Sequence, residues 1–123
     1  MSLAPISPPY KWRIVRASFD PIQGSEQAGI RPAIIVSRES VNAVLPVVTV
    51  IPLTTRKTNR QLYPTEAALA ADTGGIPTES IALVHQIRTI SKTRLMGSYG
   101  VLTNPAVIAD IQRAIRAHLD LGP

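Results

Sequence analysis

The chain has 123 residues, 45% of them hydrophobic, and it contains no cysteine. This length suits one compact domain with a modest core and leaves no room for a second. The absence of cysteine excludes a disulfide framework and a thiolate metal site. Thirteen Lys and Arg against eight Asp and Glu give a formal net charge of +5, which favours a polyanionic partner such as nucleic acid or an acidic peptide.

The apolar runs of the sequence are far too short to cross a bilayer. The chain also opens without the charged, apolar and small-residue pattern of a secretory leader. We therefore expect a cytoplasmic protein that has no membrane partner.

The first nine residues predict an extended, poorly ordered lead-in. Pro5, Pro8 and Pro9 lie in this stretch, and proline removes backbone donors and disfavours helix. The single domain is expected to span residues 10–121.

Three segments predict strands in the first half of the chain. Residues 11–19 (KWRIVRASF) have the length and residue types of a strand, and residues 31–37 and 46–53 are β-branched runs bracketed by prolines. We expect the latter two strands to be buried on both faces. A polar, glycine-punctuated loop at residues 20–29 follows the first strand, and a loop of this length in a compact domain is typical of a functional or a disordered segment.

A polar and basic stretch at residues 54–61 (TTRKTNRQ) interrupts the strands, and strand character resumes at residues 80–90. If this last strand is unbroken, its side chains alternate between the two faces of the sheet. Gln86 and Arg88 would then share one face, and His85 would point to the other.

A helix is predicted at the C-terminal end. Asn104 is suited to cap it and Pro105 to occupy its first position. An apolar stripe at helical spacing follows, formed by Val107, Ile108, Ile111, Ile115 and Leu119. The other helical candidate is a short turn at residues 91–95. Several short strands with one terminal helix predict a small, strongly bent β-barrel capped by that helix.

Common catalytic signatures are missing: the sequence has no phosphate-cradling glycine loop, no metal-spaced histidine pair and no nucleophile elbow. His85 and His118 lie on different predicted elements, so a paired-histidine ribonuclease would need the fold to bring them together. We expect neither a metal ion nor an organic cofactor.

Three segments carry a resemblance to a known family: residues 24–33 (GSEQAGIRPA), 51–54 (IPLT) and 86–90 (QIRTI). In order and spacing they resemble the PemK/MazF toxins of type II toxin-antitoxin systems, and the match covers most of residues 11–119. The first segment is highly specific, the third moderately so, and the second is weak alone. The resemblance implies a mainly β (α+β) fold, a small SH3-like antiparallel β-barrel of the PemK/MazF/CcdB-like kind with a C-terminal α-helix.

The resemblance also implies an activity. Toxins of this family, the mRNA interferases, dimerise and cleave single-stranded RNA or mRNA at short motifs without a metal, and an antitoxin with an acidic tail neutralises them. Such cleavage needs attack of a 2′-hydroxyl on the adjacent phosphate, a group that takes its proton, one that protonates the leaving 5′-oxygen, and a cation for the developing charge. The products are a cyclic phosphate and a 5′-hydroxyl end.

By family position Arg31 is the expected catalytic cation and Thr54 the expected catalytic threonine. A guanidinium stays charged and binds two phosphate oxygens at once, and the residue before Pro32 is held extended. The threonine hydroxyl can hydrogen-bond the phosphate or the attacking oxygen, although it is a poor base. The structural alternatives are a surface arginine and an ordinary strand-end threonine.

RNA contacts are expected from the two polar loops and the last strand. By resemblance Gln86 contacts RNA, and Arg88 should share its face. Glu26 and Gln27 shape the site or read a base, unless Glu26 merely pairs with a nearby arginine. The second loop offers a backbone track for single-stranded RNA, or else a solvated charged loop; its expected contacts are Arg56, Lys57, Asn59 and Arg60.

One departure from the family pattern is visible. The Gly-acidic pair that usually opens the first strand is replaced by Trp12-Arg13, which is expected to add positive charge near the active-site side of the barrel. Two non-enzymatic alternatives stay open. One is a gyrase-binding toxin of the CcdB kind, although its tryptophan-bearing tail is replaced here by Asp120-Leu121-Gly122-Pro123. The other is a barrel that only binds nucleic acid or a regulatory peptide.

Overall fold

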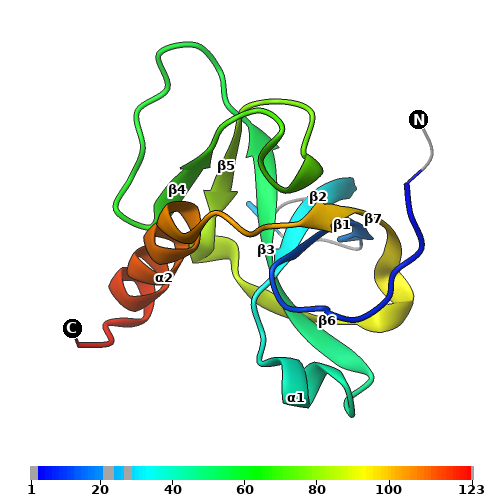
Figure 1. The fold of residues 1–123 in the computed structure, drawn as a ribbon. Coiled ribbons are helices and arrows are strands. Elements are labelled where there is room, and N and C mark those ends of the chain that lie inside the picture. Colours follow the sequence, from blue (N-terminus) through cyan, green and yellow to red (C-terminus); the bar gives the residue numbers. More distant parts are fainter. Residues whose placement is uncertain (1–2, 21–23, 27–28, 123) are drawn as a thin grey trace.

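The computed structural model describes residues 3–20, 24–26 and 29–122. In this part of the chain, seven strands form one bent antiparallel sheet in the order β4-β5-β3-β2-β1-β7, and β6 also pairs with β3. The long helix α2 packs beside β4 at one end (Figure 1). The predicted mainly β fold with a C-terminal helix is confirmed, but the sheet is not a closed barrel, because its path ends at β4 and β7 without pairing them.

The strands are β1 (Arg13–Ser18), β2 (Ile30–Ile35), β3 (Val47–Thr55), β4 (Glu66–Leu69), β5 (Ser80–Leu83), β6 (Arg88–Ser91) and β7 (Leu95–Val101). The helices are α1 (Glu39–Asn42) and α2 (Pro105–Leu119), and three single 3-10 turns are η1 (Thr73–Gly75), η2 (Val84–Gln86) and η3 (Lys92–Arg94). None of the helices in the described part of the chain is long and apolar enough to span a membrane.

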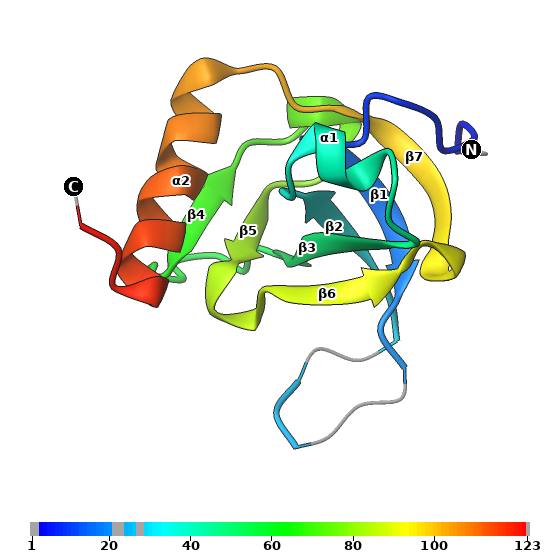
Figure 2. The same ribbon diagram turned by 90° about the horizontal axis from the view of Figure 1, so that it is seen from below.

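Two expectations for the strands need correction. β3 continues through Thr55, so Thr54 lies within a strand and not in the loop that follows it. Residues 80–90 are not one strand, because η2 separates β5 from β6. β5 and β6 lie one after the other along the same edge of β3 (Figure 2). The alternation of side chains along a single strand therefore cannot be used to place Gln86 and Arg88 on the same face.

The core consists of two apolar clusters on opposite faces of the sheet. One face buries Ile14, Ile34 and Ile51, and the other buries Val15, Ile35 and Val50. Neighbours in sequence alternate between the clusters, as the two-residue period of a strand requires. The prediction that residues 31–37 and 46–53 form strands buried on both faces is thereby confirmed over the central residues of β2 and β3.

Helix α2 has the predicted start and the predicted apolar face. The Asn104 side chain accepts hydrogen bonds from the backbone N–H of Ala106, at 3.0 Å, and of Val107, at 3.5 Å. Ile111 is fully buried in the core. Leu119 is 50% exposed, so the last member of the stripe extends past the sheet that the helix covers.

Replacing Asn104 by alanine is expected to lower the free energy of unfolding by about 1 kcal/mol, since two N–H groups of the first turn lose their acceptor. Urea unfolding followed by circular dichroism measures this difference. Asn104→Asp is the matched control, because it keeps the acceptor oxygen, and it should retain wild-type stability or exceed it slightly. Equal stability of the alanine variant and the wild type would contradict the capping role.

The part of the lead-in that the structure describes lies against the sheet. Ala4 and Ser98 exchange two backbone hydrogen bonds of 3.1 and 2.8 Å along the outer edge of β7. Arg13 Nε donates to the Pro9 carbonyl at 2.9 Å, and Arg13 Nη1 donates to Ser98 Oγ at 2.8 Å. Glu39 accepts hydrogen bonds from the Tyr10 and Lys11 N–H groups. An edge strand with unpaired backbone groups favours association with other chains. The lead-in covers part of the β7 edge.

Arg13 therefore does not add charge beside the predicted site. It begins β1 opposite Val101, whereas Arg31 pairs with Ala17 at the other end of β1. Trp12 adopts a φ of 67°, a left-handed conformation that favours glycine. Its backbone is fixed on both sides, because its N–H donates to Ile35 O at 2.7 Å and its carbonyl accepts from Leu102 N at 2.8 Å.

Candidate functional site

Arg31 and Thr54 lie on adjacent strands. β2 pairs with β3 through Ala33↔Pro52, Ile34↔Ile51 and Ile35↔Val50. Arg31 and Thr54 each lie two residues beyond the Ala33↔Pro52 pair, at the same end of the two strands. Both residues are partly exposed, so the predicted catalytic cation and hydroxyl are accessible at the same end of two paired strands.

Gln86 and Arg88 are in contact with the first loop. Gln86 Nε2 donates to the backbone carbonyl of Ser25 at 3.2 Å, and Arg88 Nη1 lies 3.5 Å from Glu26 Oε2. The Arg88 guanidinium also lies over the ring of the buried Phe19, 5.7 Å from its centroid. Glu26 thus pairs with a nearby arginine, which was the structural alternative for this residue. Gln27, the other loop residue predicted to contact RNA, lies outside the described residues.

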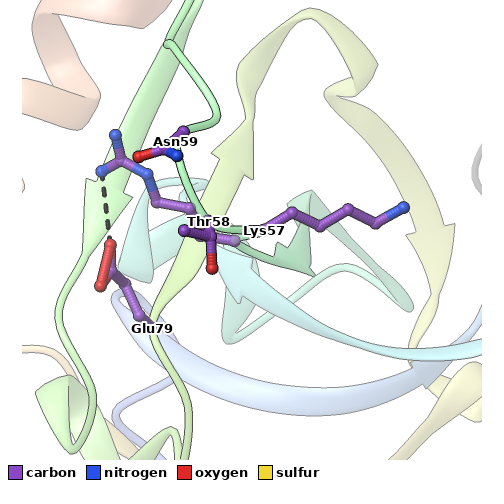
Figure 3. A pocket seen from close by; sticks show the side chains of 5 residues that line it. Lys57, Thr58, Asn59 and Glu79 are labelled. Carbon is purple, nitrogen blue, oxygen red and sulfur yellow. Dashed lines mark ion pairs between the residues drawn. The ribbon is translucent and has the colours of Figure 1, made fainter.

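The second loop begins where β3 ends and carries an open pocket. The pocket has a volume of about 480 Å³ and is lined by Arg56, Lys57, Thr58, Asn59 and Glu79. Arg56 Nη1 lies 3.4 Å from Glu79 Oε1, and both side chains reach solvent. Lys57 extends away from Glu79 (Figure 3). Three of the four residues predicted here, Arg56, Lys57 and Asn59, are therefore brought together around one hollow.

Arg60, the fourth, is engaged elsewhere. Its guanidinium donates two hydrogen bonds, of 2.9 and 2.7 Å, to the carboxylate of Glu66, which is 1% exposed. These bonds lower the pKa of Glu66 and raise that of Arg60, because each charged form stabilises the other. Glu66 also accepts from Tyr63 N at 2.9 Å. The geometry of Arg60 is that of a residue holding β4 in place.

Two contributors were not predicted from the sequence. The Ser25 carbonyl receives the Gln86 amide, and Glu79 lines the pocket of the second loop. Glu79 directly precedes the predicted strand at residues 80–90, and no local pattern marks it as functional. Among the residues that the structure describes, no three His, Cys, Asp or Glu side chains gather closely enough to hold a metal ion.

Comparison with known proteins gives a match to one family. A family model described as PemK-like, MazF-like toxin of type II toxin-antitoxin system matches residues 10–119. The chain belongs to this family. The match includes both strands that carry Arg31 and Thr54, both loops and helix α2.

Two curated relatives of this family are endoribonucleases. Endoribonuclease MazF9 of Mycobacterium tuberculosis is 34% identical over 113 residues, which cover 88% of this chain and 93% of that protein. Endoribonuclease MazF of Staphylococcus saprophyticus is 33% identical over 105 residues, covering 85% and 86%. A solved structure of a mycobacterial endoribonuclease in complex with its cognate antitoxin superposes with a TM-score of 0.74 at 25% identity, covering 94% of this chain and 98% of that one.

Proposed function

We propose that this chain is a toxin endoribonuclease that cleaves single-stranded RNA or mRNA at short sequence motifs without a metal ion. The observation that carries the proposal is that Arg31 and Thr54 lie on paired strands at the end from which both polar loops extend. The two curated relatives, both endoribonucleases, support the same activity.

The proposed chemistry is an internal transfer within the RNA. The 2′-hydroxyl loses its proton to a base and its oxygen attacks the adjacent phosphorus. The bond from phosphorus to the 5′-oxygen breaks and that oxygen takes up a proton, so a cyclic phosphate and a 5′-hydroxyl remain. Arg31 stabilises the negative charge that develops on the phosphoryl oxygens, where a guanidinium can bind two oxygens together. Thr54 donates a hydrogen bond to the phosphate or to the attacking oxygen.

The RNA is proposed to run between the two loops. Gln86 and Arg88 line one side together with the first loop, and Lys57 offers an exposed cation on the other. The net charge of +5 favours such binding, and affinity should fall as salt rises, because bound cations release counterions from phosphate.

We propose two partners, and the net positive charge supports the first of them. One is an antitoxin with an acidic segment that lies along the RNA track and blocks it, in line with the solved complex of a related endoribonuclease with its cognate antitoxin. The other is a second copy of this chain, as a homodimer. Both interactions are proposed to take place in the cytoplasm.

The testing experiment is incubation of the purified protein with a long, weakly structured RNA, followed by mapping of the new ends by primer extension. We expect discrete cuts at a recurrent short motif that leave 5′-hydroxyl ends. Intact RNA would instead favour the non-enzymatic alternatives, binding of gyrase or of nucleic acid alone.

Addition of EDTA to the same reaction is expected to leave the cleavage rate within about twofold, because Arg31 supplies the positive charge that a metal ion would otherwise bring to the phosphate. The rate of product formation is compared with and without the chelator. Activity that is lost in EDTA and restored by magnesium would contradict the metal-free mechanism.

A further inference from the structure

The pocket of the second loop contains a carboxylate among cations. We propose that this pocket binds one base of the RNA and that Glu79 selects guanine in it. The inference rests on the proposed RNA substrate and deepens it, because it assigns a base and a specificity-determining residue to a part of the surface described so far only as a backbone track.

The pocket is built before any ligand arrives. Thr55 pairs with Ser80 in the β3–β5 ladder, and Arg56 N donates to the Glu79 carbonyl at 2.9 Å, so Glu79 is fixed to the end of β3. On the loop side, Arg60 N donates to the Lys57 carbonyl at 3.1 Å and closes a turn. A site whose walls are fixed in advance binds a ligand with less loss of conformational entropy.

The turn also positions the amide of the loop. Asn59 has a φ of 63°, a left-handed conformation that asparagine tolerates better than most residues. Two contacts of Arg60 fix the turn. Its side chain is bound to the buried Glu66, and the Arg60 carbonyl accepts a hydrogen bond from Arg56 Nη2 at 2.9 Å. Asn59 is therefore presented by a fixed backbone as an exposed donor and acceptor.

The charges indicate a base and not a phosphate as the occupant. The carboxylate of Glu79 would repel a phosphate, and its pairing with Arg56 reduces the attraction that this cation alone would exert. Lys57, which extends away from Glu79 (Figure 3), is placed to take the phosphate backbone. The part of the pocket beside Glu79 is therefore suited to a group that donates hydrogen bonds.

Glu79 retains the capacity to accept such bonds. Its side chain is 55% exposed, and its ion pair with Arg56 is loose, at 3.4 Å. An exposed pair of this kind contributes little, so a ligand can replace it at small cost. A carboxylate offers about four lone-pair positions on two oxygens, enough for two parallel hydrogen bonds.

Guanine is the base that matches this acceptor. Its Watson–Crick edge presents two adjacent donors, the N1–H and the N2 amino group, whereas adenine and cytosine each offer one amino group there and uracil one imino N–H. The O6 atom of guanine, beside these donors, is an acceptor for Arg56 or for the amide of Asn59. Arg56 lies two residues beyond Thr54, about 7 Å along the strand, so the selected guanine is a nucleotide close to the cleaved bond.

The test is binding of short fluorescent RNAs measured by anisotropy, with every sugar 2′-O-methylated so that no attacking hydroxyl exists. The probes are uridine heptamers that carry one central guanine, inosine or adenine. Inosine lacks only the N2 amino group. The proteins are the wild type, Glu79→Gln, and Asp110→Asn as a matched control, since Asp110 loses the same charge on α2 without lining the pocket.

We expect the wild type and Asp110→Asn to bind the guanine probe about tenfold more tightly than the inosine and adenine probes, within the range of one two-bond base contact. In Glu79→Gln the three affinities should agree within about twofold. Equal binding of all probes by the wild type, or an unchanged guanine preference in Glu79→Gln, would overturn the inference. A guanine preference without cleavage of long RNA would leave this pocket standing and defeat the proposed nuclease.

Discussion

Replacement of Arg31 by alanine is expected to reduce the rate of RNA cleavage by about a thousandfold, with most of the loss in kcat. The reason is that the guanidinium acts on charge that develops only in the transition state, so its removal weakens substrate binding less than catalysis. Single-turnover cleavage of a substrate that contains the mapped motif measures the effect. A variant that cuts at the wild-type rate would refute the proposed role of Arg31.

Three controls separate this role from a structural one. The unfolding transition of Arg31→Ala should stay close to that of the wild type, because the residue is partly exposed and its strand pairing is made by the backbone. Arg31→Lys keeps the charge but loses the two-pronged contact, and should recover only part of the rate. Thr54→Ala should slow cleavage and Thr54→Ser should restore it, since serine retains the hydroxyl.

Replacement of Glu66 by alanine is expected to lower the free energy of unfolding by about 3 kcal/mol, although the residue lies outside the proposed RNA track. The change leaves Arg60 without its carboxylate and Tyr63 N without its acceptor. The expected value is at the lower end for a broken buried ion pair, because Arg60 is 32% exposed and reaches water. Urea unfolding at neutral pH provides the measurement.

The pH dependence of stability gives an independent check of the same pair. The Arg60 hydrogen bonds lower the pKa of Glu66 in the folded state below that of the unfolded chain. The pair therefore stabilises the fold fully above about pH 4.3, the ordinary glutamate pKa, and loses this contribution as the pH falls through the lowered folded value. Glu66→Gln should flatten that acid limb of the stability curve.

Two neighbouring cations of the second loop should behave in opposite ways. Arg60→Ala should destabilise the protein, because the buried Glu66 is left without its partner. Lys57→Ala should leave the free energy of unfolding within about 0.5 kcal/mol and weaken RNA binding, since its side chain is exposed. An Arg60→Ala variant that is stable but binds RNA poorly would show that Arg60 contributes to RNA binding and not to stability.

The sequence predicted those parts of the molecule that local chemistry determines. The extent of α2 follows from the Asn104 cap and the spacing of its apolar residues, both local features. Arg31 and Thr54 were found because the motif around each is continuous in sequence. Their place at the same end of β2 and β3 then follows from the antiparallel pairing of these two strands.

Features that depend on distant partners were not predicted. β4 (EAAL) consists largely of helix-forming residues, and it is a strand because it pairs with β5. The break between β5 and β6 is a 3-10 turn closed by a bond from Ile87 N to the Val84 carbonyl, at 3.0 Å, and no local pattern in residues 80–90 marks it. Likewise, nothing in the loop sequence distinguishes Arg60, which holds a buried carboxylate, from Lys57, which faces solvent.

Trp12 is the single tryptophan of the chain, and its position makes the protein its own spectroscopic probe. The indole packs against the core at the end of β1 that is distant from Arg31. The Trp12 backbone is hydrogen-bonded to both β2 and the segment that follows β7. Intrinsic fluorescence should therefore report loss of the sheet on unfolding. RNA bound between the two loops should leave that emission almost unchanged, so stability can be followed by tryptophan fluorescence in the presence of substrate without an added label.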